Sequence, residues 1–177
     1  MSTTPSAKTE QTARDESHQV LTFVLGNETY GVDILRVQEI RGWSAVTKIP
    51  QAPSHVLGVL NLRGSIVPIV DLRMRFSLER VEYTAVTVII VVSVNSPAGR
   101  RDFGVVVDGV SDVVDVKTAD VKDAPELGST AATDYIRGLV PVSDRMVVLL
   151  DIDRLIVTDM AAFSSSLADP PAASAAA

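Results

Sequence analysis

The chain contains two copies of one sequence pattern, and this internal repeat restricts its possible folds more than any other feature. Tyr30 to Ile40 (YGVDILRVQEI) aligns with Phe103 to Val113 (FGVVVDGVSDV) at an offset of 73 residues. Gly58 to Leu72 (GVLNLRGSIVPIVDL) aligns without gaps with Gly138 to Ile152 (GLVPVSDRMVVLLDI) at an offset of 80 residues. Two blocks that recur in the same order indicate a duplicated unit of about 75 residues. Tyr30 and Phe103 are therefore predicted to occupy equivalent core sites, as are Asp71 and Asp151.

Each copy has the pattern of short β-strands joined by tight turns. The expected strand pairs are Val20–Leu25 with Thr29–Ile34 and Val59–Leu62 with Ser65–Val70 in the first copy, and Val86–Val94 with Asp102–Val107 and Arg137–Val142 with Arg145–Leu150 in the second. Pro68 cannot donate a backbone hydrogen bond, so its segment is predicted to form an edge strand or a bulge. Asn95 to Gly99 is expected to form a longer turn than its counterpart in the first copy.

The helical signal is weak. Asp33 to Ile40 spaces apolar residues by three and predicts a short helical turn, and Asp151 to Val157 predicts a second one with Asp151 as N-cap. Val121 to Thr133 contains Pro125 and Gly128 and is predicted to be a loop.

The predicted fold class is therefore all-β with minor helix: two small β-barrels packed together by internal duplication. Each barrel is too small to be very stable alone, so a shared apolar seam is expected between them. A repeat in sequence need not be one barrel in space, because a strand of one copy can complete the barrel of the other.

Composition divides the chain into three parts. Residues 1–18 are polar and are predicted to be a disordered N-terminal tail, while residues 159–177, rich in Ala, Ser and Pro, are predicted to be a flexible C-terminal tail. The domain is predicted to span 19–158, with the first half-repeat at about 19–82 and the second at about 83–158.

Charge and residue content exclude several classes of protein. The net charge of −6 argues against a nucleic-acid binder, and the absence of Cys excludes disulfides and fits a reducing cytoplasm. The start of the chain lacks the apolar stretch of a signal peptide. The longest apolar run, Val86 to Val94, is far short of the roughly 18–20 residues that a membrane helix requires, so no direct membrane insertion is expected.

A search for catalytic or metal-binding residues finds little. His18 and His55 are expected to be isolated surface side chains, no His/Cys/Asp group has zinc spacing, and no phosphate-binding loop is present. No metal and no cofactor are expected. Asp108, Asp112 and Asp115 permit a cation or acid–base site, but capping turns in solvent is the preferred interpretation. The alternative function that remains open is a double-barrel domain that binds a small ligand or cation, with hydrolytic chemistry at Asp108 or Asp112.

Two exposed charges are better placed for recognition. Arg63 lies at the tip of a predicted hairpin, where its planar guanidinium can bind carboxylates. Glu39 lies between the apolar residues Val37 and Ile40 and can flank an apolar patch used in binding. For both, a merely solvated side chain is an equally good interpretation from the residues alone. Glu39 and Arg63 are predicted to lie near each other on the surface.

Linked motifs in both copies resemble the CheW family of chemotaxis coupling proteins. They include YGVDI with VQEI at Tyr30–Ile40, GVLNLRG at Gly58–Gly64, VPIVDLR at Val67–Arg73 and, in the second copy, GVVVDGVSDV at Gly104–Val113. The resemblance extends from about Gln19 to Val157. It implies two five-stranded SH3-like barrels and a cytoplasmic, non-enzymatic adaptor. That adaptor would bridge the cytoplasmic tips of chemoreceptors (methyl-accepting chemotaxis proteins) and the regulatory domain of a CheA-type histidine kinase at the membrane-associated receptor array.

The resemblance also implies roles for individual residues. The receptor-binding residues would be Val37, Glu39, Ile40, Val88 and Gly104, and the residues for coupling and kinase binding would be Gly58, Asn61, Leu62, Arg63 and Gly64. The strands from Val105 to Val114 are expected to face the kinase.

Overall fold

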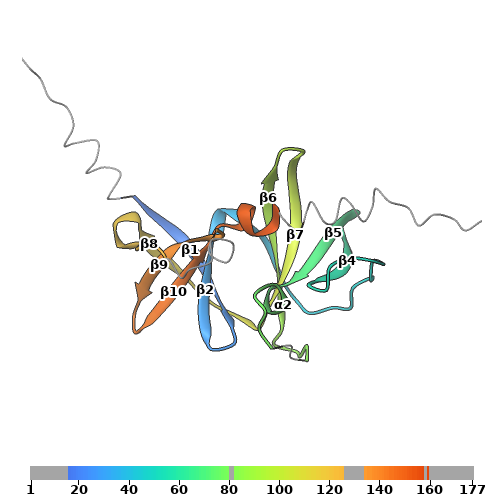
Figure 1. Cartoon of the computed structure of the whole chain (residues 1–177), viewed down its shortest axis with the longest axis horizontal. Coiled ribbons are helices and arrows are strands. Elements are labelled where there is room, and N and C mark those ends of the chain that lie inside the picture. The colour runs from blue at the N-terminus through green and yellow to red at the C-terminus, as the bar shows by residue number, and fades with distance from the viewer. Residues whose placement is uncertain (1–15, 80–81, 126–133, 158, 160–177) are drawn as a thin grey trace, which may run out of the picture.

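The computed structural model describes residues 16–79, 82–125, 134–157 and 159, and most of them lie in two five-stranded sheets. The first sheet, here called the β1 barrel, has the strand order β8 (Gly109–Lys117), β1 (Ser17–Leu25), β2 (Glu28–Asp33), β10 (Arg145–Leu150) and β9 (Ile136–Val142). The second, the β6 barrel, has the order β3 (Val37–Gly42), β6 (Val88–Ser96), β7 (Gly99–Val107), β5 (Ser65–Asp71) and β4 (Val56–Leu62). Figure 1 shows the two side by side.

The sheets exchange strands between the two sequence copies. The first copy supplies β1 to β5 and the second supplies β6 to β10, yet the β1 barrel contains β1 and β2 together with β8, β9 and β10. Replacing each strand by its counterpart in the other copy converts one sheet order into the other. The predicted duplication is thus present in the topology, and neither half-repeat corresponds to one barrel.

The registers of the strands repeat with the same symmetry. Tyr30 pairs with Phe23 in the β1 barrel, and Phe103 pairs with Val92 in the β6 barrel. In the parallel ladders, Gly31 lies opposite Leu149 and Gly104 lies opposite Ile69. The predicted equivalence of Tyr30 and Phe103 is confirmed.

Asp71 and Asp151 are also equivalent, because each accepts hydrogen bonds at the start of a short helix. The Asp71 carboxylate accepts from the N–H of Arg73 at 2.9 Å, and that of Asp151 accepts from the N–H of Arg154 at 3.1 Å. The helices that follow are α2 (Leu72–Arg75) and the helical segment 152–157. The predicted N-cap of Asp151 is therefore confirmed.

Each sheet is closed into a barrel by the chain that follows its edge strand, β3 in one sheet and β8 in the other. After β3, Thr47 forms a bridge to Val59 in β4, and after β8 and the turn η2 (Thr118–Asp120), Lys122 forms a bridge to Leu139 in β9. These bridges join the two edges of each sheet and make the barrels predicted from the sequence.

Three apolar clusters form the core, and the largest lies between the barrels. One small cluster, which includes Val20 and Leu149, lies within the β1 barrel, and another, which includes Ile69 and Ile89, lies within the β6 barrel. The largest contains Phe23, Phe103, Leu150 and other residues of both barrels. This is the expected shared seam, and it lets two small barrels bury enough apolar surface to be stable.

Stacked aromatic rings extend across this seam. Tyr30 stacks on Phe23 with ring centroids 6.0 Å apart and on Phe76 at 5.4 Å, and Phe76 stacks on Tyr135 at 5.3 Å. Because Phe76 directly follows α2 and Tyr135 directly precedes β9, the stack fastens the first copy to the second.

Several local predictions require correction. Pro68 lies in β5, an interior strand of its sheet and not an edge. It is tolerated because Val59, opposite Pro68, directs its own N–H and C=O to Thr47, so the donor-free nitrogen of Pro68 faces β7. The parallel ladder with β7 begins only at Ile69 and requires no donor at Pro68.

The turn after Asn95 is also shorter than predicted, because Ser96 pairs with Gly99. The predicted helical turn after Asp33 is the η1 turn (Ile34–Arg36), but Val37 to Ile40 belong to β3.

The described elements extend slightly beyond the predicted domain range of 19–158. β1 begins at Ser17, inside the predicted tail, and Asp159 is buried. The rest of the predicted tails and residues 126–133 of the predicted loop lie outside the described residues.

Candidate partner-binding surface

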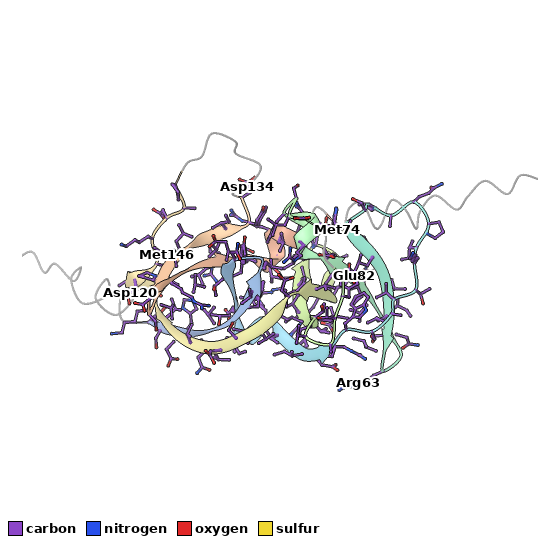
Figure 2. All side chains as sticks on the ribbon, turned by 90° about the horizontal axis from the view of Figure 1, so that it is seen from below. Arg63, Met74, Glu82, Asp120, Asp134 and Met146 are labelled. Carbon is purple, nitrogen blue, oxygen red and sulfur yellow. The ribbon has the colours of Figure 1, made fainter. Side chains whose placement is uncertain are left out.

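The turn between β4 and β5 presents Arg63 to solvent. Arg63 and Gly64 both have positive φ, 54° and 87°, as a two-residue type I′ hairpin turn requires. Asn61 holds the turn, since its side-chain oxygen accepts a 2.9 Å hydrogen bond from the N–H of Gly64. The Arg63 side chain is 88% exposed. Figure 2 shows it at one end of the molecule, with Asp120 and Met146 near the other end.

Glu39 lies within reach of Arg63, as predicted. A guanidinium nitrogen of Arg63 is 3.8 Å from a carboxylate oxygen of Glu39, whose side chain is 34% exposed. The next residue, Ile40, is 46% exposed on β3, an outer strand of the β6 barrel. Glu39, Ile40 and Arg63 are thus all accessible along the outer edge of the β6 barrel and are here called the β3 strip, although Glu39 and Ile40, as consecutive strand residues, point to opposite faces of β3.

The remaining candidates are packed to different degrees. Val37, Leu62 and Val88 are half-buried, Val37 and Val88 against the shared seam and Leu62 against the interior of the β6 barrel. Val37 pairs with Val92 and Val88 pairs with Gly42, so they lie at opposite ends of the β3–β6 ladder. They do not join into one groove.

Two of the candidate glycines are buried where the chain allows no side chain. A Cβ at Gly104 would lie 2.4 Å from Ile69 Cδ1, and a Cβ at Gly58 would lie 2.1 Å from the backbone oxygen of Thr47. Both glycines are buried, so neither can contact a partner directly. Any effect of these positions on binding must pass through the packing of the sheet.

The sequence-equivalent strip on the other barrel has different chemistry. At an offset of 73 residues, Asp112 corresponds to Glu39 and Val113 to Ile40, and Val113 is 47% exposed on the outer strand β8. Ser143 corresponds to Arg63 and has the same positive φ, 52°. The molecule therefore presents two strips of one geometry, of which only the β3 strip has an arginine at the turn.

Part of the range expected to face the kinase is inaccessible. Val105, Val106 and Val107 are all buried, because β7 is an interior strand. Within the range Val105–Val114, the accessible apolar side chain is that of Val113 on β8.

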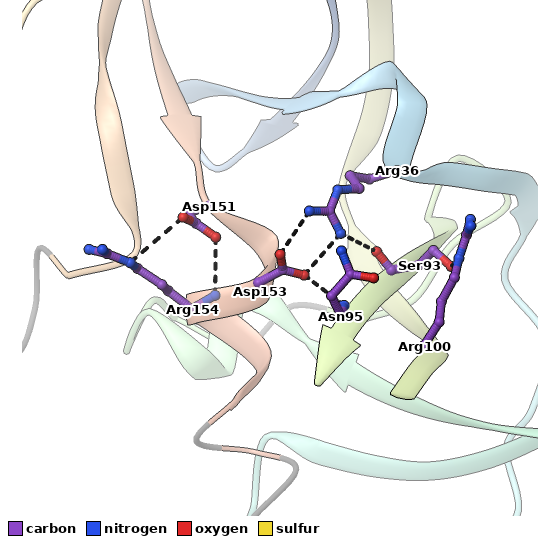
Figure 3. Close-up of polar contacts among 7 residues, drawn as sticks. All are labelled: Arg36, Ser93, Asn95, Arg100, Asp151, Asp153 and Arg154. Carbon is purple, nitrogen blue, oxygen red and sulfur yellow. Dashed lines mark hydrogen bonds and ion pairs between the residues drawn. The ribbon is translucent and has the colours of Figure 1, made fainter. Parts of the chain in front are cut away.

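Two ion pairs that the sequence analysis missed connect the copies. Arg73 of α2 donates two hydrogen bonds to Asp108, at 2.6 and 2.5 Å, and Arg36 of η1 donates two to Asp153, at 3.0 and 2.8 Å. Figure 3 shows Arg36 held between Asp153 and strand β6. Arg73 and Asp153 occupy equivalent positions, each two residues after a capping aspartate, so the two pairs have opposite orientations. The signal available in the repeat was the alignment of Arg73 with Asp153, while Arg36 aligns with Gly109, one residue after Asp108.

The Arg73 pair decides the role of Asp108. Burial alone would raise the pKa of the Asp108 carboxyl, but hydrogen bonds from Arg73 and from the N–H of Gly26 outweigh it and lower that pKa below its usual value. A carboxylate that is ionised and already bound in this way is a structural anchor and is poorly suited to act as a general base. The preferred interpretation of Asp108 as a solvated turn cap was therefore incomplete.

The other candidates for catalysis do not converge. Asp112 and Asp115 are exposed on β8 and do not cap turns, and His55 pairs with the buried Asp159. Among the described residues no three His, Cys, Asp or Glu side chains come together as metal ligands. In the same part of the chain, no helix is long and apolar enough to cross a membrane.

Comparisons with known proteins agree on one family. Residues 19–160 match the model of the CheW-like domain. The chain is 46% identical over 150 residues to a chemotaxis protein CheW of Klebsiella aerogenes, covering 85% of this chain and 88% of that protein. It is 38% identical to a chemotaxis protein CheW of Rhizobium meliloti, covering 76% and 84%. The crystal structure of the scaffolding protein TtCheW from Thermoanaerobacter tengcongensis superposes with a TM-score of 0.72 at 28% identity, covering 80% of this chain and 93% of that one.

Proposed function

This chain belongs to the CheW family of non-catalytic chemotaxis scaffold proteins, and we propose that it couples chemoreceptors to a CheA-type histidine kinase in the cytoplasm. It would bind the cytoplasmic tip of a methyl-accepting chemotaxis protein with one surface and the regulatory domain of the kinase with another. The role requires two separable surfaces on one rigid body.

The observation that supports this proposal is the pair of equivalent strips with different chemistry. Ile40 and Val113 are about equally exposed on outer strands of different barrels, but only the strip that contains Ile40 also has an arginine–glutamate pair. We assign the β3 strip to the receptor and the β8 strip around Val113 to the kinase. Arg63, which the resemblance groups with the residues for coupling and kinase binding, is included with the receptor strip because it lies 3.8 Å from Glu39. Burial of the exposed apolar side chain contributes binding energy, and charges elsewhere on the same strip orient the partner.

The test exchanges one apolar residue for a charge on each strip. Val37→Glu is unsuitable because Val37 packs against the shared seam, so Ile40→Glu and Val113→Glu form the matched pair. An unpaired charge in a desolvated contact costs on the order of 2–5 kcal/mol of binding. Titration calorimetry with a purified receptor tip and a kinase regulatory domain measures both affinities.

We expect each variant to weaken binding to one partner only. Ile40→Glu should weaken receptor binding by about 30-fold or more and leave kinase binding nearly unchanged, and Val113→Glu should do the reverse. If either variant, still folded by circular dichroism, weakens both contacts equally, the assignment of two separate surfaces is wrong.

The alternative, a ligand- or cation-binding domain with hydrolytic acids, has less support. Its candidate Asp108 is bound to Arg73 and Gly26, and Asp112 is an isolated exposed side chain on β8.

A further inference from the structure

The parallel ladder between β5 and β7 is incomplete. Its register covers only Ile69–Asp71 opposite Gly104–Val106, although β5 begins four residues earlier, at Ser65, and β7 begins five residues earlier, at Gly99. A groove of about 960 Å³ lies here, lined by Ser65, Ile66, Val67 and Pro68 on one side and by Arg100, Arg101, Asp102 and Phe103 on the other. Consecutive residues of a strand point to opposite faces of the sheet. Because four consecutive residues of each strand line the groove, the groove runs between the edges of the two strands and not along one face of the sheet. We call it the β5–β7 slot.

The slot is long because the β6–β7 hairpin is long. In the β1 barrel, the hairpin ends with Leu25 opposite Glu28, whose equivalents in the β6 barrel are Val94 and Arg101. The β6–β7 hairpin continues for two more pairs, Asn95 with Arg100 and Ser96 with Gly99. Figure 1 shows it rising above the rest of the molecule. The β7 residues before Gly104 pair with β6 on one side and have an open edge toward the slot.

The β7 side of the slot has two arginines and one aspartate, so it has a net positive charge on a protein with a net charge of −6. Arg100 and Arg101 are both exposed on β7. Arg100 donates to the hydroxyl of Ser93, which donates to Asp102, so this arginine is held against the strand. The structure gives Arg101 no hydrogen bond or ion pair within the described residues, which leaves its guanidinium available.

The corresponding region of the β1 barrel has the opposite charge. Two smaller grooves, of about 450 and 390 Å³, are lined there by Glu28, Asp112 and Asp144, with Arg145 as the basic residue. Glu28 occupies the position equivalent to Arg101. The β1 barrel thus provides an internal control of similar geometry and reversed charge.

We propose that the β5–β7 slot binds an extended, acidic segment of a partner protein as an added strand beside β7. The open backbone edge would form main-chain hydrogen bonds, and Arg101 would bind a carboxylate of the segment, whereas Arg100 points to the opposite face of β7 and is held by Ser93. Val67 and Phe103, both 2% exposed, line the slot from opposite faces of the sheet, Val67 from the barrel interior and Phe103 from the shared seam. This inference goes beyond the coupling function, because it uses none of Glu39, Ile40, Arg63 and Val113.

The test uses the full chain and a fluorescein-labelled hexapeptide of alternating glutamate and valine, with fluorescence anisotropy as the readout. Arg101→Glu copies the residue of the β1 barrel and should weaken peptide binding at least tenfold. Arg145→Glu is the matched control on the other barrel and should change the affinity less than twofold. Equal affinities of the wild-type chain and Arg101→Glu, or equal losses in both variants, would overturn the proposal.

Two further measurements examine the mode of binding and the occupant. Peptides that carry N-methyl groups on one or the other alternate set of residues separate strand addition from simple charge attraction. One of the two methylated peptides should bind at least tenfold more weakly, and unchanged binding of both would exclude strand addition. A synthetic peptide of residues 160–177 is added as competitor; if it displaces the probe at similar concentration, the chain's own end is the occupant and the partner proposal is wrong.

Discussion

At the residue scale, two glycines of the repeat lie where any side chain would collide with a neighbouring strand. Gly31 and Gly104 occupy equivalent sites, and a Cβ at either would lie 2.4 Å from a side-chain atom of a neighbouring strand, Val20 Cγ1 or Ile69 Cδ1. The alignment of Gly31 with Gly104 was visible in the sequence. Its reason, the close approach of a parallel strand from the other copy, was not visible, because the exchange of strands is a property of the fold.

Alanine substitutions of three glycines should separate packing from backbone effects. Gly104→Ala should cost about 1–3 kcal/mol, because Ile69 and Ile89 must shift to make room. Gly58→Ala should cost more, because its φ is 148° and the blocking atom is the backbone oxygen of Thr47. Gly42→Ala has no atom within 4 Å and should be nearly neutral. Urea unfolding measures all three, and a Gly58→Ala chain as stable as Gly42→Ala would contradict this account.

Arg63 should matter for recognition and little for stability. Its ion pair with Glu39 is long, 3.8 Å, and its side chain is 88% exposed, so Arg63→Ala should change the free energy of unfolding by less than about 1 kcal/mol. Receptor binding should fall in the same variant. Thermal unfolding and calorimetry together decide the matter, since a large loss of stability with unchanged receptor affinity would reverse the assignment.

At the scale of elements, the η1 turn, the short helices and the loop at Asp108 act as connectors between the copies. Arg36 of η1 binds Asp153 in the helical segment 152–157, and Asp108 after β7 binds Arg73 of α2. In both pairs one partner comes from each copy. The helical elements are too short to be stable alone, so their ion pairs and the apolar seam hold them in place.

The Arg73–Asp108 connection predicts a stability that falls in acid. The folded-state pKa of Asp108 lies below its usual value, so the unfolded chain binds the proton first as the pH decreases. The stabilisation is therefore complete above the ordinary Asp pKa of about 3.9 and is lost as the pH falls through the lower, folded-state pKa. Asp108→Asn should cost about 1–3 kcal/mol at pH 7.

The measurement is urea unfolding of the wild-type and Asp108→Asn chains at pH 7, 5 and 3. The difference between them should shrink at the lowest pH, and Asp112→Asn serves as the control with an exposed carboxylate. A difference that is the same at all three values would mean that the ionised state of Asp108 does not contribute.

The sequence predicted strands better than it predicted their places in the sheets. Periodicity and turn residues gave the four expected hairpins, and the turn at Arg63-Gly64 formed as expected. Pro68 was misjudged because its tolerance depends on Thr47, which lies beyond β4 in space. Charge and family motifs predicted two residues of the β3 strip, Glu39 and Arg63, from the sequence alone. The burial of Gly104 and the separation of Val37 from Val88 depend on pairing with β6, which local pattern does not determine.

At the scale of the whole molecule, the interleaved sheets make the two copies mutually dependent. Thr22 and Asp112 hydrogen-bond across 90 residues of sequence, and the ladder of β1 with β8 joins opposite copies. Neither copy contains all five strands of one sheet. The stability of each barrel therefore depends on both copies being present.

Cutting the chain between the copies tests this dependence. Residues 1–82 and 83–177, expressed separately, should each fail to form a stable folded monomer, because each would leave incomplete sheets and half of the shared seam exposed. Mixed in equal amounts, they should recover the near-ultraviolet circular dichroism of the intact chain and elute as a one-to-one complex. A half that folds as a stable monomer would show that the interleaving is not essential.

The interleaved topology also bears on the origin of the fold. A single unit of about 75 residues could build this architecture only as a symmetric homodimer, with the present seam as the interface between subunits. In such a dimer both ion pairs would necessarily have the same orientation. Here Arg73 meets Asp108 while Asp153, its counterpart, meets Arg36. This reversal requires two halves of different sequence, so the opposed pairs show that a fused chain can hold its seam with contacts that a symmetric homodimer cannot form.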